Sequence, residues 1–150
     1  MRRGFSLIEL LIVIAIILVI ITVAVPPYQR AQTLAREMAA SKAVQTIQTD
    51  EVIYQSQYGH FASSLRELGP PDAGPSSPAA AGLISGALAS GALGGYKFTL
   101  TGTADTYAIT ASPVAFGSSG IKSFYLDQSG ILCATEGQEP ATSSSPEFAR

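Results

Sequence analysis

One carboxylate lies inside the longest apolar segment of this 150-residue chain, and its placement constrains the fold more than any other feature. Residues 10–21 contain no polar side chain, and the apolar character extends with few interruptions from Phe5 to Val25. As a helix, this segment would span about 30 Å, the thickness of the hydrocarbon core of a bilayer. A charge at membrane depth costs roughly 2.5–3.5 kcal/mol. Glu9 therefore needs a partner that offsets this cost.

The remaining composition argues against several classes of function. Nine basic and eleven acidic residues give a net charge of −2, without a basic stripe that could bind nucleic acid phosphates. No catalytic constellation can be built around His60, the one histidine, so we do not expect an enzyme, a bound cofactor or a His/Cys metal cluster. Asp127 and Glu136 flank the last predicted hairpin and are the one pair that could help to hold Ca²⁺. Cys133 is the one cysteine, which leaves a small strand residue or an intersubunit disulfide.

The first residues form a very short basic leader, Met1–Gly4. Its two arginines hold this end in the cytoplasm by the positive-inside rule. A secretory signal would have a longer basic region and a better small-residue cleavage site after the apolar run. A plain signal anchor would not place Ser6 and Glu9 at the mouth of the apolar segment. A third interpretation accounts for both residues.

The segment Gly4-Phe5-Ser6-Leu7-Ile8-Glu9, followed by the apolar run, resembles the processing site of type IV prepilins and pseudopilins. The resemblance implies that a membrane prepilin peptidase/methyltransferase cleaves after Gly4 and N-methylates Phe5. It also implies that Glu9 is the filament assembly residue. An inner-membrane assembly platform, membrane lipid before assembly and other copies of the chain in a helical homopolymer are the implied partners.

Physical chemistry gives Glu9 a partner that agrees with this resemblance. Cleavage would create an α-amino group on Phe5 with an unperturbed pKa of about 7.7–8.0, so it would be mostly cationic at neutral pH. In a staggered pair of helices, that cation can meet Glu9 of a neighbouring copy, and the attraction is large at low dielectric. Our hypothesis is that this pair sets the axial register of a filament, while residues 10–21 supply the apolar packing.

Two prolines, Pro26 and Pro27, follow the apolar segment and predict a kink or local unwinding, a helix break within a longer helix. Pilins commonly have a helix-weakening proline where Pro26 falls. We divide the helix into a transmembrane or filament-core segment, residues 5–25, and an amphipathic continuation, residues 26–58. The continuation has two apolar faces. We assign one to neighbouring subunits and the other to the chain's own globular domain; the alternative is a helix enclosed within one domain. The neighbour face holds Ala31, Leu34, Ala35, Met38, Val52 and Ile53, and the domain face holds Ala40, Ala43, Val44, Ile47, Tyr54 and Tyr58.

Residues 59–135 are predicted to form the globular domain. A short helix through Leu68 and a weak helix in residues 79–93 precede a change to period-two alternation. Two antiparallel hairpins follow, one from Tyr96 to Ala111 and one from Ile121 to Thr135. The fold class is therefore α+β: a long N-terminal helix packed on a four-stranded antiparallel sheet. Residues 136–150 are polar and are predicted to be a flexible C-terminal tail.

These features predict the structural subunit of a type IV pilus, a fimbrium used for adhesion, motility, uptake or secretion. The precursor would reside in the inner membrane and the filament on the cell surface, outside the cell. Two alternatives remain. One is a pseudopilin of a type II secretion system, which builds a short periplasmic piston. The other is a minor pilin that acts as an adhesin or DNA-binding tip.

Overall fold

The computed structural model describes residues 5–148, and for residues 24–26 it describes the backbone alone. Gly4 and the predicted leader of residues 1–4 lie outside the described residues. The chain divides into two compact units, one up to Gln32 and one from Thr33 onward. Each unit is described by itself below.

The first helix, α1, runs from Leu7 to Tyr58. It includes Pro26 and Pro27, and the kink that the sequence predicts there stays a prediction. The helix ends at Gly59, whose φ of +82° is the left-handed conformation that glycine adopts at helix C-termini. The amide of Gly59 still donates to the carbonyl of Gln55 at 2.8 Å, which closes the last turn.

A five-stranded antiparallel sheet follows, with its strands in sequence order. The strands are β1 (Ala92–Leu93), β2 (Tyr96–Gly102), β3 (Tyr107–Pro113), β4 (Lys122–Asp127) and β5 (Cys133–Glu136). The predicted α+β class and both predicted hairpins are confirmed. The difference is the short β1, which forms inside the stretch expected to be a weak helix; within that stretch, helix is confined to α3 (Gly86–Ala89).

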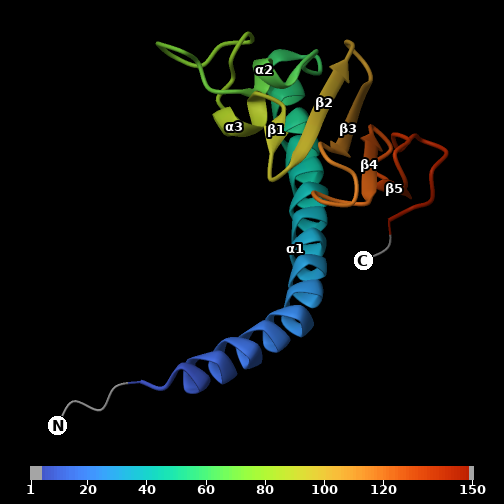
Figure 1. Cartoon of the computed structure of the whole chain (residues 1–150). Coiled ribbons are helices and arrows are strands. Elements are labelled where there is room, and N and C mark those ends of the chain that lie inside the picture. The colour runs from blue at the N-terminus through green and yellow to red at the C-terminus, as the bar shows by residue number, and fades with distance from the viewer. Residues whose placement is uncertain (1–4, 149–150) are drawn as a thin grey trace. The chain divides into compact units, whose positions relative to one another are not determined.

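Alternation of side chains decides which face of the sheet is buried. Tyr96, Phe98 and Leu100 of β2 are buried, whereas the residues between them are exposed. Because successive strand residues point to opposite faces, this pattern gives the sheet one apolar face. That face lies beside α1 within the unit that begins at Thr33 (Figure 1).

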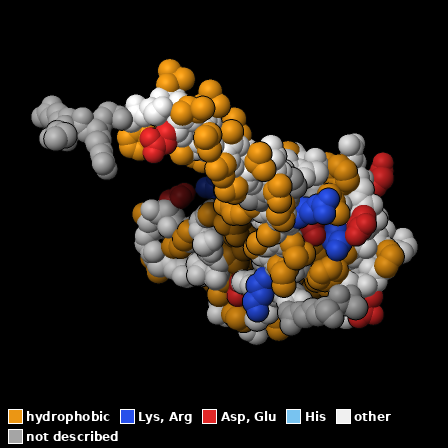
Figure 2. Space-filling model, turned by 60° about the horizontal axis from the view of Figure 1, so that its bottom comes forward, with side chains coloured by type: hydrophobic (Ala, Val, Ile, Leu, Met, Phe, Trp, Pro, Cys, Tyr) orange, Lys and Arg blue, Asp and Glu red, His pale blue; other side chains and the backbone are white. Residues whose placement is uncertain are grey.

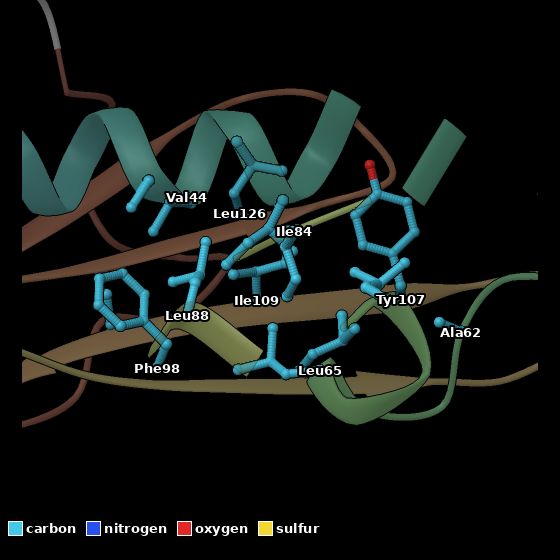
Figure 3. Close-up of a cluster of buried hydrophobic side chains, with 14 of the residues drawn as sticks. Val44, Ala62, Leu65, Ile84, Leu88, Phe98, Tyr107, Ile109 and Leu126 are labelled. Atoms are coloured by element: carbon cyan, nitrogen blue, oxygen red, sulfur yellow. The ribbon is translucent and has the colours of Figure 1, made fainter. Parts of the chain in front are cut away.

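The core forms between this face of the sheet and one side of α1. In Figure 3, Val44 from α1 lies over Ile109 and Leu126 from the sheet, while Leu65, Ile84 and Leu88 close the cluster from the connecting segments. Leu65 belongs to α2 (Leu65–Leu68), the short helix that the sequence predicts after the first helix. The core therefore fixes residues 37–58 of α1 against the sheet.

Gly102, at the end of β2, makes the closest backbone approach in this core. A Cβ atom added there would collide with the carbonyl oxygen of Ala62 and lie 2.9 Å from its carbonyl carbon. We expect Gly102→Ala to lower the free energy of unfolding by about 3 kcal/mol, because the opposing group is backbone and cannot rotate away. Denaturant unfolding of the detergent-solubilised chain measures this. Gly86→Ala is the matched control, since its Cβ would meet Pro70 Cγ at 3.7 Å, an ordinary contact; equal losses in both variants would contradict the prediction.

Candidate assembly site

The predicted assembly residues lie at the start of α1. Phe5 and Ser6 precede the helix, and the carbonyl of Ser6 accepts hydrogen bonds from the amides of Glu9 at 3.1 Å and Leu10 at 3.2 Å. Glu9 is therefore in the first helical turn, where the helix dipole favours a negative charge. Within the part of the chain that the structure describes, no hydrogen bond or ion pair of the Glu9 carboxylate is present. The described residues of one copy therefore do not neutralise this acid, which is exposed.

Apolar side chains cover the N-terminal part of α1 and are exposed. From Phe5 to Val23, the large apolar residues are between 45 and 81 % exposed, and Figure 2 shows hydrophobic side chains gathered along this part of the helix. Among the described residues, α1 is long and apolar enough to cross a membrane, and its most apolar window is not buried by the rest of the chain. Burying a leucine or isoleucine side chain is worth about 1.5–3 kcal/mol. This surface therefore requires a cover of lipid or of other protein.

The second half of α1 has the two faces that the sequence predicts. Val44, Ile47 and Tyr54 of the domain face are fully buried, and Ala40 and Ala43 are nearly so. On the opposite face, Leu34, Met38, Val52 and Ile53 are exposed, although they are apolar. The unit that begins at Thr33 thus covers one face of its helix and leaves the other uncovered, in contrast to a helix enclosed within one domain.

Sequence reasoning missed two buried acids on the domain face, Glu37 and Glu51. Residues 37, 40, 44, 47, 51, 54 and 58 follow one another at spacings of three and four, so the helical period places both acids on the buried side. The apolar pattern alone does not reveal them, because both side chains are charged. The period itself would have found them.

Glu37 holds the loop between β3 and β4 against the helix. Its Oε1 atom accepts a hydrogen bond from the amide of Ile121 at 2.8 Å, and its Oε2 atom lies 4.0 Å from Lys122 Nζ. Next to it, Arg36 Nη1 donates to the carbonyl of Ser118 at 3.0 Å. These contacts fix a loop on which Val114 and Phe116 are exposed.

Glu51 is fully buried and only partly satisfied. Its Oε2 atom accepts a hydrogen bond from the amide of Ala62 at 3.0 Å, whereas Oε1 has no partner among the described residues. The pKa of Glu51 is raised to about 7, mainly by burial. The nearby Glu67 also contributes to this rise, whereas the Ala62 amide and His60 partly offset it. This acid lies in the core and not at an exposed surface, so we assign it to the stability of the domain.

The structure separates the residues that were considered for other chemistry. Asp127 ends β4, whereas Glu136 pairs with Lys122 at the start of β4, so the two acids lie at opposite ends of the strand pair and cannot share a Ca²⁺ ion. Asp127 accepts instead from the amide of Ser129 at 2.8 Å. No cluster of three His, Cys, Asp or Glu side chains that could hold a metal ion occurs among residues 5–148. His60 bonds locally, with Nδ1 2.9 Å from the carbonyl oxygen of Phe61.

Comparison with known families gives a match at the N-terminus. Residues 1–25 match the family model described as the prokaryotic N-terminal methylation motif. No curated protein matches the chain. The matched segment includes Gly4, Phe5 and Glu9 and overlaps the first part of α1, and the rest of α1 and the antiparallel sheet follow along the chain. The chain thus carries the N-terminal methylation motif of type IV pilins and pseudopilins.

Proposed function

We propose that this chain is the structural subunit of a type IV pilus, cleaved after Gly4, N-methylated on Phe5 and polymerised into a helical surface filament. The observation that carries the proposal is that the apolar N-terminal part of α1, up to Val23, is exposed in a chain with the methylation motif. The first turn of this helix contains Glu9, an acid without a partner among the described residues. Such a surface suits insertion into a membrane first and burial among identical helices afterwards.

Cleavage prepares the chain for assembly by changing the charge at its end. Removal of residues 1–4 takes away two arginines and exposes the amino group of Phe5. That cation pairs with Glu9 of a neighbouring copy, so two groups that are each costly in lipid offset one another. Transfer from membrane to filament then keeps the apolar helix covered, because helix contacts replace lipid contacts. The charge pair favours one axial stagger over others.

The uncovered face of α1 supplies a second contact between copies. Leu34, Met38, Val52 and Ile53 lie opposite the buried face, and their exposure supports the assignment of this face to neighbouring subunits. A helical homopolymer needs such contacts, because each copy must present two different surfaces to its neighbours. The inner membrane is the store for the precursor, and the pilus lies on the cell surface.

Fractionation followed by mass spectrometry tests this proposal. In sheared surface filaments, we expect the mature chain, beginning at methylated Phe5, as the dominant species. Recovery of the same processed chain only from the periplasm and inner membrane would instead favour the pseudopilin of a type II secretion system. Recovery as a trace component of surface filaments would favour a minor pilin. A chain that still begins at Met1 in every fraction would contradict all three.

A further inference from the structure

The last strand of the sheet, β5, has a cover that the sequence does not predict. The amide of Ala134 donates to the carbonyl of Pro146 at 2.9 Å, and the amide of Phe148 donates to the carbonyl of Leu132 at 2.7 Å. Cys133 lies directly opposite Glu147 in an antiparallel bridge. We call residues 137–148 the C-terminal strap. Its last three residues occupy the edge of β5 that would otherwise be unpaired.

Only a few contacts attach the C-terminal strap to the domain in the described part of the chain. At its far end, the Phe148 ring meets the Phe124 ring nearly at a right angle, with centroids 5.3 Å apart, and Lys122 Nζ lies 5.8 Å from the Phe148 centroid. At its near end, the Gly137 amide donates to the carbonyl of Ile121 at 3.0 Å. Ala141 is the buried residue between them.

The other hydrogen bonds of the strap are internal. The amide of Ser145 donates to the carbonyl of Thr142, and the amide of Thr142 donates to the hydroxyl of Ser145 at 3.0 Å. This turn lies between Pro140 and Pro146, and these hydrogen bonds join residues of the strap to one another. A segment with an internal turn and few attachments can open locally at a smaller free energy than the whole domain.

Cys133 lies beside the C-terminal strap, as its in-sheet neighbour. It is 6 % exposed, although it is not a member of the main core cluster. Ala134, the next residue, packs against that core, so strand alternation places the Cys133 side chain on the other face of the sheet. Its neighbours across the strand pairs are Tyr125 on β4 and Glu147 on the strap. Loss of the strap would therefore expose the Cys133 thiol.

We propose that the C-terminal strap is a removable cover that keeps the β5 edge from pairing with the β5 edge of a second copy. Edge strands present unpaired amide and carbonyl groups to other chains, and proteins block them with short strands or covering segments. At the opposite edge of this sheet, β1 has two residues, which limits pairing there. Two β5 edges could pair antiparallel about a twofold axis, which is the self-complementary form of contact.

This role goes beyond the proposed function, because it concerns a contact that filament assembly must avoid. Copies packed side by side at high local concentration would have their sheet edges available to one another. A closed strap leaves the helix surfaces as the available contacts.

Thiol alkylation of the full chain in detergent micelles tests the proposal, because Cys133 is the one cysteine in the sequence. We expect Phe148→Ala to raise the rate of maleimide alkylation about tenfold, the factor that corresponds to an aromatic contact worth about 1.4 kcal/mol. A chain ending at Glu136 should react faster still. Matched controls are Ser143→Ala, at an exposed position in the turn, and a chain ending at Phe148; both should react at the original rate.

Hydrogen exchange separates opening of the strap from unfolding. In Phe148→Ala, the Ala134 amide should lose protection, while amides between β2 and β3 keep theirs. A bis-maleimide should then link two copies through Cys133 in the chain ending at Glu136 and not in the control ending at Phe148. An unchanged alkylation rate, equal loss of protection across the whole sheet, or the absence of linked copies would each overturn the proposal.

Discussion

Replacing Glu9 with alanine should leave a precursor that inserts and is processed but does not enter filaments. The substitution removes a charge that costs roughly 2.5–3.5 kcal/mol at membrane depth, so membrane insertion of the precursor should not suffer. Assembly should fail, because the amino group of Phe5 in the next copy would enter an apolar environment without an opposite charge. Removing one partner of a buried ion pair typically costs about 3–5 kcal/mol. We expect the yield of sheared filaments to fall by at least about a hundredfold, as 1.4 kcal/mol corresponds to a factor of ten.

Two further variants test whether the loss of assembly is due to the charge of Glu9. Glu9→Gln keeps the size and a hydrogen-bonding group but not the charge, so it should assemble almost as poorly as Glu9→Ala. Glu139→Ala removes an exposed acid from the C-terminal segment and should assemble normally. Mass spectrometry of the membrane fraction must find methylated Phe5 in every variant, which places the defect after processing. Filaments of Glu9→Ala with unchanged yield and subunit spacing would show that the charge pair is not needed.

The sequence predicted those features that depend on local pattern. The alternation of Tyr96, Phe98 and Leu100 with polar neighbours identified β2 and its buried face. The helical period separated Val44 and Ile47 from Leu34 and Met38, and the structure places these pairs on buried and exposed faces. Both patterns repeat within a few residues, so neighbouring positions report on the same environment.

Features that depend on contacts between distant residues were not predicted. Glu37 can be buried because it accepts a hydrogen bond from the amide of Ile121, which is 84 residues away along the chain. The weak helix expected in residues 79–93 is replaced in part by β1, because pairing with β2 gives Ala92 and Leu93 partners that the local sequence does not reveal. Composition favours a flexible tail for residues 136–150, whereas in the structure Glu136 belongs to β5 and Glu147 pairs with Cys133. The apolar Ala141 and Phe148 are the residues that attach this segment.

The candidate assembly site shows the same difference between local patterns and distant contacts. The motif around Gly4, Phe5 and Glu9 is contiguous, so the sequence identified it and the family comparison found it again. Among residues 5–148, no side chain forms a hydrogen bond or ion pair with the Glu9 carboxylate, so the partner that we propose for it belongs to another copy. A contact between copies would show in the sequence of one chain only as a group whose burial has no compensation there. In this chain that group is Glu9, a charged residue within an apolar helix.

Glu51 differs from Glu9, because the free-energy cost of burying its carboxyl falls on a single folded copy. This cost predicts how the free energy of unfolding depends on pH. The ordinary pKa of a glutamate, 4.5, rises to about 7 in the folded chain because of burial. Below pH 4.5 the carboxyl is neutral in both the folded and the unfolded chain. Between pH 4.5 and about pH 7, the Glu51 carboxyl is ionised in the unfolded chain but still protonated in the folded chain. The free energy of unfolding therefore falls by about 1.4 kcal/mol per pH unit in this range. The total loss by pH 8 is on the order of 3 kcal/mol, and it is constant at higher pH.

Glu51→Gln should remove this slope. A glutamine is neutral at every pH and can still accept the Ala62 amide, so the variant should equal the original chain near pH 4.5 and exceed its free energy of unfolding at pH 8 by about 3 kcal/mol. Urea unfolding of both chains in detergent micelles across pH 4.5–8 measures the difference between them, which isolates the contribution of Glu51. Glu139→Gln, at an exposed acid, is the control and should follow the original chain at each pH. If the free energy of unfolding of Glu51→Gln also equalled that of the original chain at each pH, the prediction would be wrong. The Glu51 carboxyl would then be ionised in the core at neutral pH and stabilised by a group that binds its free oxygen.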